Sequence, residues 1–294
     1  RFAFDFQHLK IPGNSTSVGV KPHVGGYGEM AMERNNRRIN SAKRRKLIAA
    51  YRLPGASSLS PGLSAPVKLE GDDELNAAVV NNSVMSFVEG MTSLNKEYTR
   101  KSYLLASSYV SDVLRIARGT EAWYNEFIKV MSSLGWMPVR SSFERVYTTR
   151  KGLSVQLAAL NLVAATVAST FLSGPLISAL PKRVGEAIEA LKQLPASFEL
   201  FKRNTTTHEG GDFGLASCSE TAGEVSMVLV TYSSHGVSKQ WGMPFLEWDS
   251  ASVEAFSGRT CLVLNSSVVN EATIQLMRDS AGDKVRLAIA QYRI

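Results

Sequence analysis

The sequence GLSVQLAALNLVAATVASTFLSGPLISALP, residues Gly152–Pro181, contains no Asp, Glu, Lys, Arg or His. Basic pairs border it, with Arg150–Lys151 before the run and Lys182–Arg183 after it. About 20 apolar residues are enough to cross a bilayer, so the run meets the length criterion. Polar residues dilute it, however, and Gly174–Pro175 interrupts it. The run therefore fits a helix packed against protein better than a helix that faces lipid.

At helical spacing, the run is apolar on almost every side. A helix of this kind lies at the centre of a bundle or in a membrane. We expect a central helix that is buried in the folded protein, and we keep as a second hypothesis that the same segment inserts into lipid. The residues that would insert are Leu153, Leu157, Leu160, Leu162, Val163, Val167, Phe171 and Leu172.

The positive charge of the chain is concentrated in one segment. The 294 residues include 33 Lys and Arg and 26 Asp and Glu, for a net charge of +7. Outside residues 33–52, bases and acids balance. Such a patch is typical of a surface that binds nucleic acid, an anionic membrane or an acidic partner. The candidate polyanion-binding residues are Arg34, Arg37, Arg38, Lys43, Arg44, Arg45 and Lys46.

The pattern predicts an α+β protein in three parts. Residues 1–71 read as an extended arm that contains the basic segment 34–52, since Gly, Pro and Ser are frequent there. Residues 72–203 are expected to form a helical bundle around the uncharged helix, and residues 212–294 a small antiparallel β-sandwich.

Local signals within these parts place individual elements. One helix is expected from Asp72 to Gly119, a second from Thr120 to Gly135, and a third from the capping-box pattern at Ser141–Glu144. A short amphipathic helix is expected at Lys182–Leu194. Strands are expected at Val225–Tyr232, Trp241–Trp248, Thr260–Leu264 and Lys284–Tyr292, and Val268–Arg278 fits a short helix or a strand.

The sequence offers little catalytic chemistry. Nucleotide-binding, zinc-protease and serine-hydrolase motifs are absent, and the four histidines are far apart. The grouping His208–Asp212 fits a solvated turn better than a metal site. Cys218 and Cys261 lack a CxxC spacing, so two buried thiols are favoured over a zinc site or a disulfide. We expect no enzymatic activity, no cofactor and no metal.

Aromatic residues gather near the C-terminal strands. Trp241, Phe245 and Trp248, together with Tyr232, fit a core cluster, and they would form a ligand or membrane platform if they were exposed.

Two functional hypotheses follow from these features. The first is a membrane-active protein, secreted or delivered outside the cell and soluble before it meets a membrane. Its helical domain would insert and its β domain would bind a receptor or lipid, a layout similar to that of several bacterial membrane-active toxins. The second is a structural or assembly protein, such as a coat protein or nucleoprotein, whose basic arm binds nucleic acid or a neighbouring subunit of a homo-oligomer.

Overall fold

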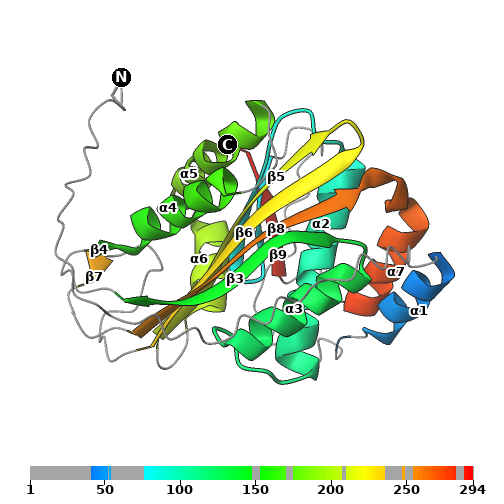
Figure 1. The fold of residues 1–294 in the computed structure, drawn as a ribbon, viewed down its shortest axis with the longest axis horizontal. Helices are drawn as coiled ribbons and strands as arrows, with labels where there is room; N and C mark the ends of the chain where they lie inside the picture. Colours follow the sequence, from blue (N-terminus) through cyan, green and yellow to red (C-terminus); the bar gives the residue numbers. More distant parts are fainter. Residues whose placement is uncertain are drawn as a thin grey trace, which may run out of the picture. The chain divides into compact units, whose positions relative to one another are not determined.

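The described part of the chain is built around one mixed β-sheet. The computed structural model describes residues 41–51, 53, 76–147, 153–169, 175–206, 210–235, 247–248, 254–282 and 288–293. All of them belong to the unit Ile39–Ile294 into which the chain divides after Arg38. The sheet has seven strands among these residues, in the order β3-β8-β6-β5-β2-β1-β9 (Figure 1).

The strands of the sheet are β1 (Ala77–Val80), β2 (Ser83–Phe87), β3 (Met137–Tyr147), β5 (Gly210–Thr221), β6 (Glu224–His235), β8 (Glu254–Asn265) and β9 (Ile289–Tyr292). Neighbouring strands are antiparallel, except that β2 and β5 are parallel. Two short strands, β4 (Leu153–Ser154) and β7 (Glu247–Trp248), pair separately.

A tight turn sets the register of the longest hairpin. Ala222 and Gly223 link β5 to β6 with φ values of 50° and 80°. Two consecutive positive φ values are typical of the two-residue turns whose twist matches that of the flanking strands. The 12-residue strands β5 and β6 therefore pair over their full length, from Thr221↔Glu224 to Gly210↔His235.

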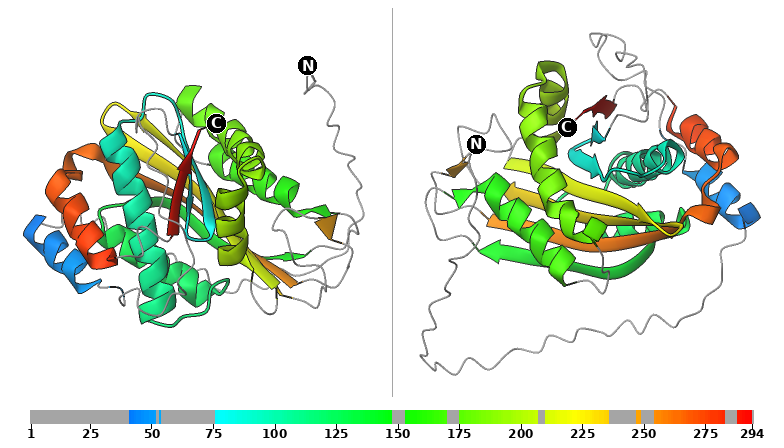
Figure 2. Two further views of the ribbon diagram at one scale, coloured as in Figure 1. Left: turned by 180° about the vertical axis from the view of Figure 1, so that it is seen from behind. Right: turned by 90° about the horizontal axis from the view of Figure 1, so that it is seen from above.

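Helices cover both faces of the sheet (Figures 1 and 2). One layer contains α4 (Val155–Ala168), α5 (Pro175–Lys192) and α6 (Pro195–Thr205). The other contains α1 (Ser41–Ala50), α2 (Ser93–Ser108) with its π-helical extension η3 (Tyr109–Val113), α3 (Glu121–Ser133) and α7 (Glu271–Ala281). A 3-10 turn, η4 (Ser266–Val268), leads from β8 towards α7.

Alternation along the strands divides the apolar interior into two cores, because successive side chains of a strand point to opposite faces. In β6, Met227 and Leu229 belong to the core under α2, α3 and α7, which we call the α2-side core. Val228 and Val230 belong to the core under α4, α5 and α6, which we call the α4-side core. The sheet is thus apolar on both faces.

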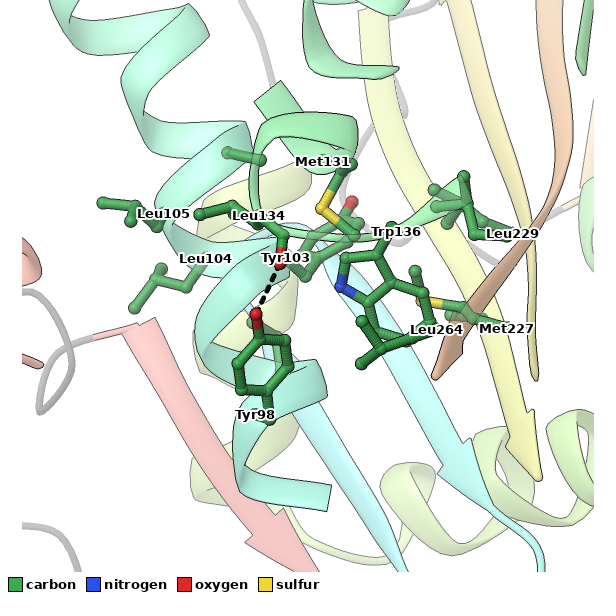
Figure 3. Close-up of a cluster of buried hydrophobic side chains, with 14 of the residues drawn as sticks. Tyr98, Tyr103, Leu104, Leu105, Met131, Leu134, Trp136, Met227, Leu229 and Leu264 are labelled. Carbon is green, nitrogen blue, oxygen red and sulfur yellow. Dashed lines mark hydrogen bonds between the residues drawn. The ribbon is translucent and has the colours of Figure 1, made fainter. Parts of the chain in front are cut away.

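Two hydrogen bonds connect α2 to the residues that follow α3. The hydroxyl of Tyr98 donates to the carbonyl of Leu134 (Figure 3), and the indole of Trp136 donates to Ser102 Oγ at 2.9 Å. Trp136 is 1% exposed and packs among apolar side chains from α2, α3 and the sheet. These bonds fix the point at which the chain leaves α3 and enters β3.

The predicted α+β class is confirmed, and two helix boundaries are as predicted. Thr120 Oγ1 accepts a hydrogen bond from the Trp123 amide, which caps α3. Gly135 has a φ of 104° just after this helix, a conformation that suits glycine. Of the two alternatives left open for Val268–Arg278, a short helix or a strand, the structure shows the helix α7, capped by Asn270.

The predicted long helix from Asp72 is wrong over residues 77–87. Those residues form the hairpin β1–β2, with Asn81 at a φ of 55° in its turn. Val79 and Val80 before Asn81–Asn82 and Val84 after them are β-branched and favour strands. Helix α2 begins only after Thr92, whose hydroxyl accepts from the Asn95 amide.

The predicted helix at Ser141–Glu144 is also wrong, because this capping-box sequence lies within β3. Phe143 packs against the α2-side core, and Ser141 Oγ donates to Tyr124 Oη at 3.1 Å on the same side. The alternating contacts with α3 hold the segment extended. The local capping signal does not outweigh this packing together with ten aligned residue pairs between β3 and β8.

Strands from both expected domains therefore join a single sheet. β1, β2 and β3 come from residues 72–203, and they pair with β9, β5 and β8, respectively, which come from residues 210–292. The helices form two layers on this sheet instead of a separate bundle, and the described strands of the second range form no separate sandwich.

Candidate functional site: an uncharged surface helix

The uncharged run forms a helix that lies on the sheet and also faces outward. Helix α4 takes up Val155–Ala168, and α5 begins at Pro175. Fourteen residues at 1.5 Å per residue give a length of about 21 Å. None of the helices within the described ranges combines the length and the hydropathy of a membrane span.

Only a narrow stripe of α4 is buried. Ala159 and Val163 are fully buried in the α4-side core, and Thr166 is 3% exposed. The Thr166 hydroxyl donates to the Leu162 carbonyl at 2.7 Å, which satisfies it within the helix. Two of these three buried side chains are small or polar, and most of the larger apolar side chains of α4 that contact the core, Leu160, Leu162 and Val167, are only partly buried.

The opposite side of α4 faces outward without a charge. Leu157 is 56% exposed, and the other exposed residues of the helix are Asn161, Ala164, Ala165 and Ala168. Surface helices normally carry charged side chains on their outer face. The uniform apolar character of the run therefore does not reflect burial on all sides, and the expected fully buried central helix is corrected to a half-exposed one.

The predicted inserting residues have different positions along this helix. Val163 is buried, Leu160, Leu162 and Val167 pack partly buried against the α4-side core, and Leu157 is exposed. Leu153 lies in β4, opposite Trp248 of β7. Phe171 and Leu172, and the side chain of Leu153, lie outside what the structure describes.

Polar contacts hold both ends of α4. At the first turn, Gln156 donates to Glu189 Oε1 of α5 and accepts from Lys192 Nζ, both at 2.9 Å. Hydrogen bonds from Lys192 and then Gln156 lower the pKa of Glu189 below its usual value of 4.5. At the last turn, Arg140 Nη1 of β3 donates to the Ser169 carbonyl at 2.8 Å.

Helix α5 is tied to the sheet through a charged contact near β2. Arg183 Nη2 lies 3.9 Å from the carboxylate of Glu89, just beyond the end of β2, and Arg183 Nη1 donates to Glu186 at 3.1 Å. The neighbouring Lys182 is 80% exposed at its side chain. The basic pair after the uncharged run is therefore at the surface of the α4–α5 layer.

The basic segment is partly docked on the α2-side layer. Ile48 of α1 is fully buried there, and its carbonyl accepts a hydrogen bond from Ser280 Oγ of α7 at 3.1 Å. The guanidinium of Arg44 lies against Gly135 at the end of α3, where a cation is favourable because of the helix dipole.

Of the candidate polyanion-binding residues, Lys43, Arg45 and Lys46 are exposed on α1, whereas Arg44 is partly buried. Arg34, Arg37 and Arg38 lie outside the described ranges. Helix α1 contains no acidic residue, so every charged side chain on its exposed side is cationic.

The aromatic platform stays a prediction. Trp248 is in β7, but its side chain, and Trp241 and Phe245 as whole residues, are outside the described part of the chain. Tyr232 is 1% exposed and packs against Phe213 in the α4-side core, as a core cluster would.

The two cysteines are buried free thiols, as the spacing favoured. Cys218 lies in the α2-side core and Cys261 in the α4-side core, so the sheet separates them. Burial raises the pKa of both thiols, that of Cys261 to about 11. Neither therefore has the character of a nucleophile.

Of the grouping His208–Asp212, the structure describes residues 210–212, whereas His208 and Glu209 lie outside the described ranges. Asp212 is in β5, 8% exposed, with a carboxylate oxygen 4.0 Å from Arg118 Nε. It borders a small pocket between the start of α3 and the sheet, next to Thr120 and Ser233. No cluster of three metal-ligating side chains occurs within the described ranges.

Comparisons with known proteins give structural similarity without sequence similarity. No family model matches the chain, and no curated protein matches it either. Among solved structures, the chain is similar to one titled delta-endotoxin, with 11% identity, a TM-score of 0.42, and coverage of 77% of this chain and 97% of that one.

Two further solved structures are similar at lower scores. One is the activated Cyt2Ba monomer from Bacillus thuringiensis subsp. israelensis, with 7% identity, a TM-score of 0.32, and coverage of 62% of this chain and 96% of that one. The other is the Evf virulence factor, with 15% identity, a TM-score of 0.34, and coverage of 82% and 90%.

Proposed function

We propose that this protein is a membrane-active, toxin-like protein that acts without a catalytic step, and that its α4–α5 layer separates from the sheet and settles on a lipid bilayer. The observation that carries the proposal is α4, a helix with no charged side chain whose outer face includes the 56% exposed Leu157. The absence of charge on the whole outer face is the informative feature, since surface helices normally carry charged side chains there and an uncharged face suits contact with an apolar partner.

The way α4 is attached supports a reversible contact. Val163 is the one fully buried branched side chain among the described residues of α4, whereas Leu160, Leu162 and Val167 are only partly buried, and polar contacts lie at the two ends of the helix. Polar contacts near a surface contribute little net stability, because water replaces them when they break. The cost of lifting α4 is therefore small compared with that of unfolding the sheet. Separation of α5 exposes more apolar surface, since Val184, Ile188 and Leu191 are fully buried in the same core, so this step requires lipid to cover that surface.

The length and flanks of the layer fit an interfacial position. At about 21 Å, α4 is shorter than the 30 Å hydrocarbon core of a typical bilayer. Its apolar side would lie at the boundary between headgroups and acyl chains. Lys182 and Arg183 on α5 would contact anionic headgroups, as basic residues next to buried apolar segments commonly do.

Removal of the layer would uncover an apolar sheet face that lipid can cover. Leu215 of β5 and Val228 and Val230 of β6 are fully buried under α4–α6. An open sheet has unpaired backbone groups at its edges, which are unfavourable inside the hydrocarbon core, so this face would lie on the bilayer without crossing it.

A crosslink between α5 and the sheet tests the proposal. Glu89→Cys and Arg183→Cys, joined by a short bismaleimide, hold the layer in place because the native side chains already meet at 3.9 Å. We expect the crosslinked protein to lose dye release from anionic vesicles and to keep its melting temperature.

A matched crosslink on the opposite layer is the control. Arg278 Nη2 of α7 and Glu97 Oε1 of α2 lie 2.6 Å apart, so Glu97→Cys and Arg278→Cys can be joined in the same way. This crosslink is expected to leave dye release unchanged. Release that persists with the Glu89–Arg183 crosslink intact would rule out separation of the layer.

A second candidate function is polyanion binding by the basic segment, as part of an assembly. The favouring observation is that Lys43, Arg45 and Lys46 are exposed on a docked helix without acids. Replacement of Arg45 and Lys46 by Gln is expected to flatten the salt dependence of nucleic-acid binding by about 0.7–0.9 units of log–log slope for each phosphate that is no longer neutralised. An unchanged slope would mean that Arg45 and Lys46 do not contact the nucleic acid and only face solvent.

A further inference from the structure

Strand β3 ends the sheet with a long exposed edge. It has 11 residues and pairs with β8 on its inner side, and none of the described strands lies on its outer side (Figure 1). Met137 is 59% exposed and Val139 is 39% exposed, and Arg140, Ser141 and Glu144 are also exposed. The other edge strand, β9, has only four residues.

An exposed edge of this length is a template for pairing with another strand, because it presents a row of backbone donors and acceptors. Proteins commonly block such edges with proline or bulges. Here Pro138 and the register shift between Pro138 and Arg140 affect only the first residues of the strand. The rest of the edge, Arg140–Tyr147, is regularly paired to β8 and keeps an extended form.

We propose that this edge binds the same edge of a second copy of the chain, with the two β3 strands antiparallel across a two-fold axis at Ser142. The reasoning does not depend on membrane activity, since the pairing uses only the edge of the folded sheet. It joins two seven-stranded sheets into one continuous sheet.

Symmetry and charge select the register. A two-fold axis that relates antiparallel edge strands is perpendicular to the sheet, so a residue can lie opposite only a residue of the same face. Arg140 and Glu144 share the α4 side of β3, because Ser141 and Phe143, which alternate with them, contact the α2 side. With the axis at Ser142, Arg140 lies opposite the partner's Glu144, and Glu144 lies opposite the partner's Arg140.

No other register of this symmetry pairs opposite charges within β3. Its charged residues are Arg140, Glu144 and Arg145, and Arg145 is on the other face. Registers centred on any of these three place like charges opposite each other, which is unfavourable at the short distances between facing side chains. The charges of β3 are thus self-complementary about Ser142.

Both charged groups retain capacity for the partner. Arg140 uses Nη1 for the Ser169 carbonyl, and a guanidinium has five N–H donors. Glu144 accepts from Arg259 Nη2 of β8 through Oε1, and a carboxylate can accept several hydrogen bonds. The Glu144 side chain is 53% exposed, so it is accessible from outside the sheet.

Charge reversal tests the register in solution, without lipid. Sedimentation velocity on the full chain over a micromolar concentration series is expected to show a reversible monomer–dimer equilibrium. Arg140→Glu or Glu144→Arg is expected to weaken it about tenfold or more, since each change makes two facing pairs repulsive. The double variant Arg140→Glu/Glu144→Arg is expected to restore it.

Restoration of the dimer by the double variant would show that the single variants fail through strand pairing and not through a structural defect. A defect caused by loss of the Glu144–Arg259 contact in Glu144→Arg would not be repaired by adding Arg140→Glu. A chain that is monomeric over the whole series would overturn the proposal. So would a dimer that the single reversals leave unchanged, or one that the double variant does not restore.

A cysteine at the axis gives an independent measurement. Residues opposite each other in an antiparallel pair have Cα atoms about 4.5–5.5 Å apart, within the range that a disulfide spans. Ser142→Cys is expected to form a disulfide-linked dimer under mild oxidation, faster than Asn125→Cys on the exposed side of α3. Equal rates for the two variants would also overturn the proposal.

Discussion

Two valines of equal chemistry on opposite sides of the sheet allow the role of α4 to be isolated. Val163 of α4 is fully buried in the α4-side core, and Val130 of α3 is 2% exposed in the α2-side core. Replacing either by Ala removes two methyl groups, about 1.6 kcal/mol of transfer free energy, plus a cavity term. We expect each variant to lose about 2 kcal/mol of stability in urea unfolding.

The two variants are expected to differ on membranes. If α4 separates before lipid binding, a loss of about 2 kcal/mol from its anchor raises the separated population by up to about 30-fold. Val163→Ala should therefore release dye from anionic vesicles faster than the unchanged protein, and Val130→Ala should not. Native-state hydrogen exchange checks the first step, since the amides of α4 should open more readily in Val163→Ala only. Equal dye-release rates for the two variants would refute the reasoning.

Three further predictions concern the fold and the basic segment. Gly258→Ala should lower the stability by about 1–3 kcal/mol, because a Cβ there would lie 2.4 Å from a buried tyrosine ring, whereas Gly185→Ala in α5, with open space around it, should raise the melting temperature slightly. Arg44→Ala should lower the melting temperature more than Arg45→Ala, since only the former guanidinium lies against the end of α3; equal effects would argue against this contact. Burial alone would raise the pKa of Glu97, but hydrogen bonds and charges from Arg278 and Lys101 lower it below 4.5. The stability that this carboxylate contributes is therefore present above pH 4.5 and is lost as the pH falls through the folded-state pKa. Urea unfolding of Glu97→Gln should accordingly show a weaker dependence on acid pH than unfolding of the unchanged protein.

The sequence correctly predicted a helix whose two ends carry capping residues. Thr120 and Gly135 bracket α3 as expected, because a cap and a left-handed residue act within one turn. The hairpin β1–β2 was missed because Phe87 continues the helical spacing of α2 towards the N-terminus. The Asn81–Asn82 turn was the available signal for it.

Pairing between distant segments could not be predicted from these local patterns. The parallel contact of β2 with β5 joins residues 83–87 to 214–218, and no periodicity reports such a partner. The same holds for the site. The uncharged run predicted an unusual helix, but an apolar helix has one sequence pattern whether it is enclosed or lies on a surface. Only its placement on the sheet separates Val163 from Leu157.

A fluorophore on α4 tests the central claim most directly. Leu157→Cys, labelled with a polarity-sensitive dye, places the probe on the exposed face of the helix, and the native cysteines are buried. On anionic vesicles, we predict that the emission rises and that quenchers attached to the acyl chains suppress it, while the same dye at Asn125→Cys on α3 does not respond. A dye at position 157 that stays in water while the vesicles leak would contradict the account.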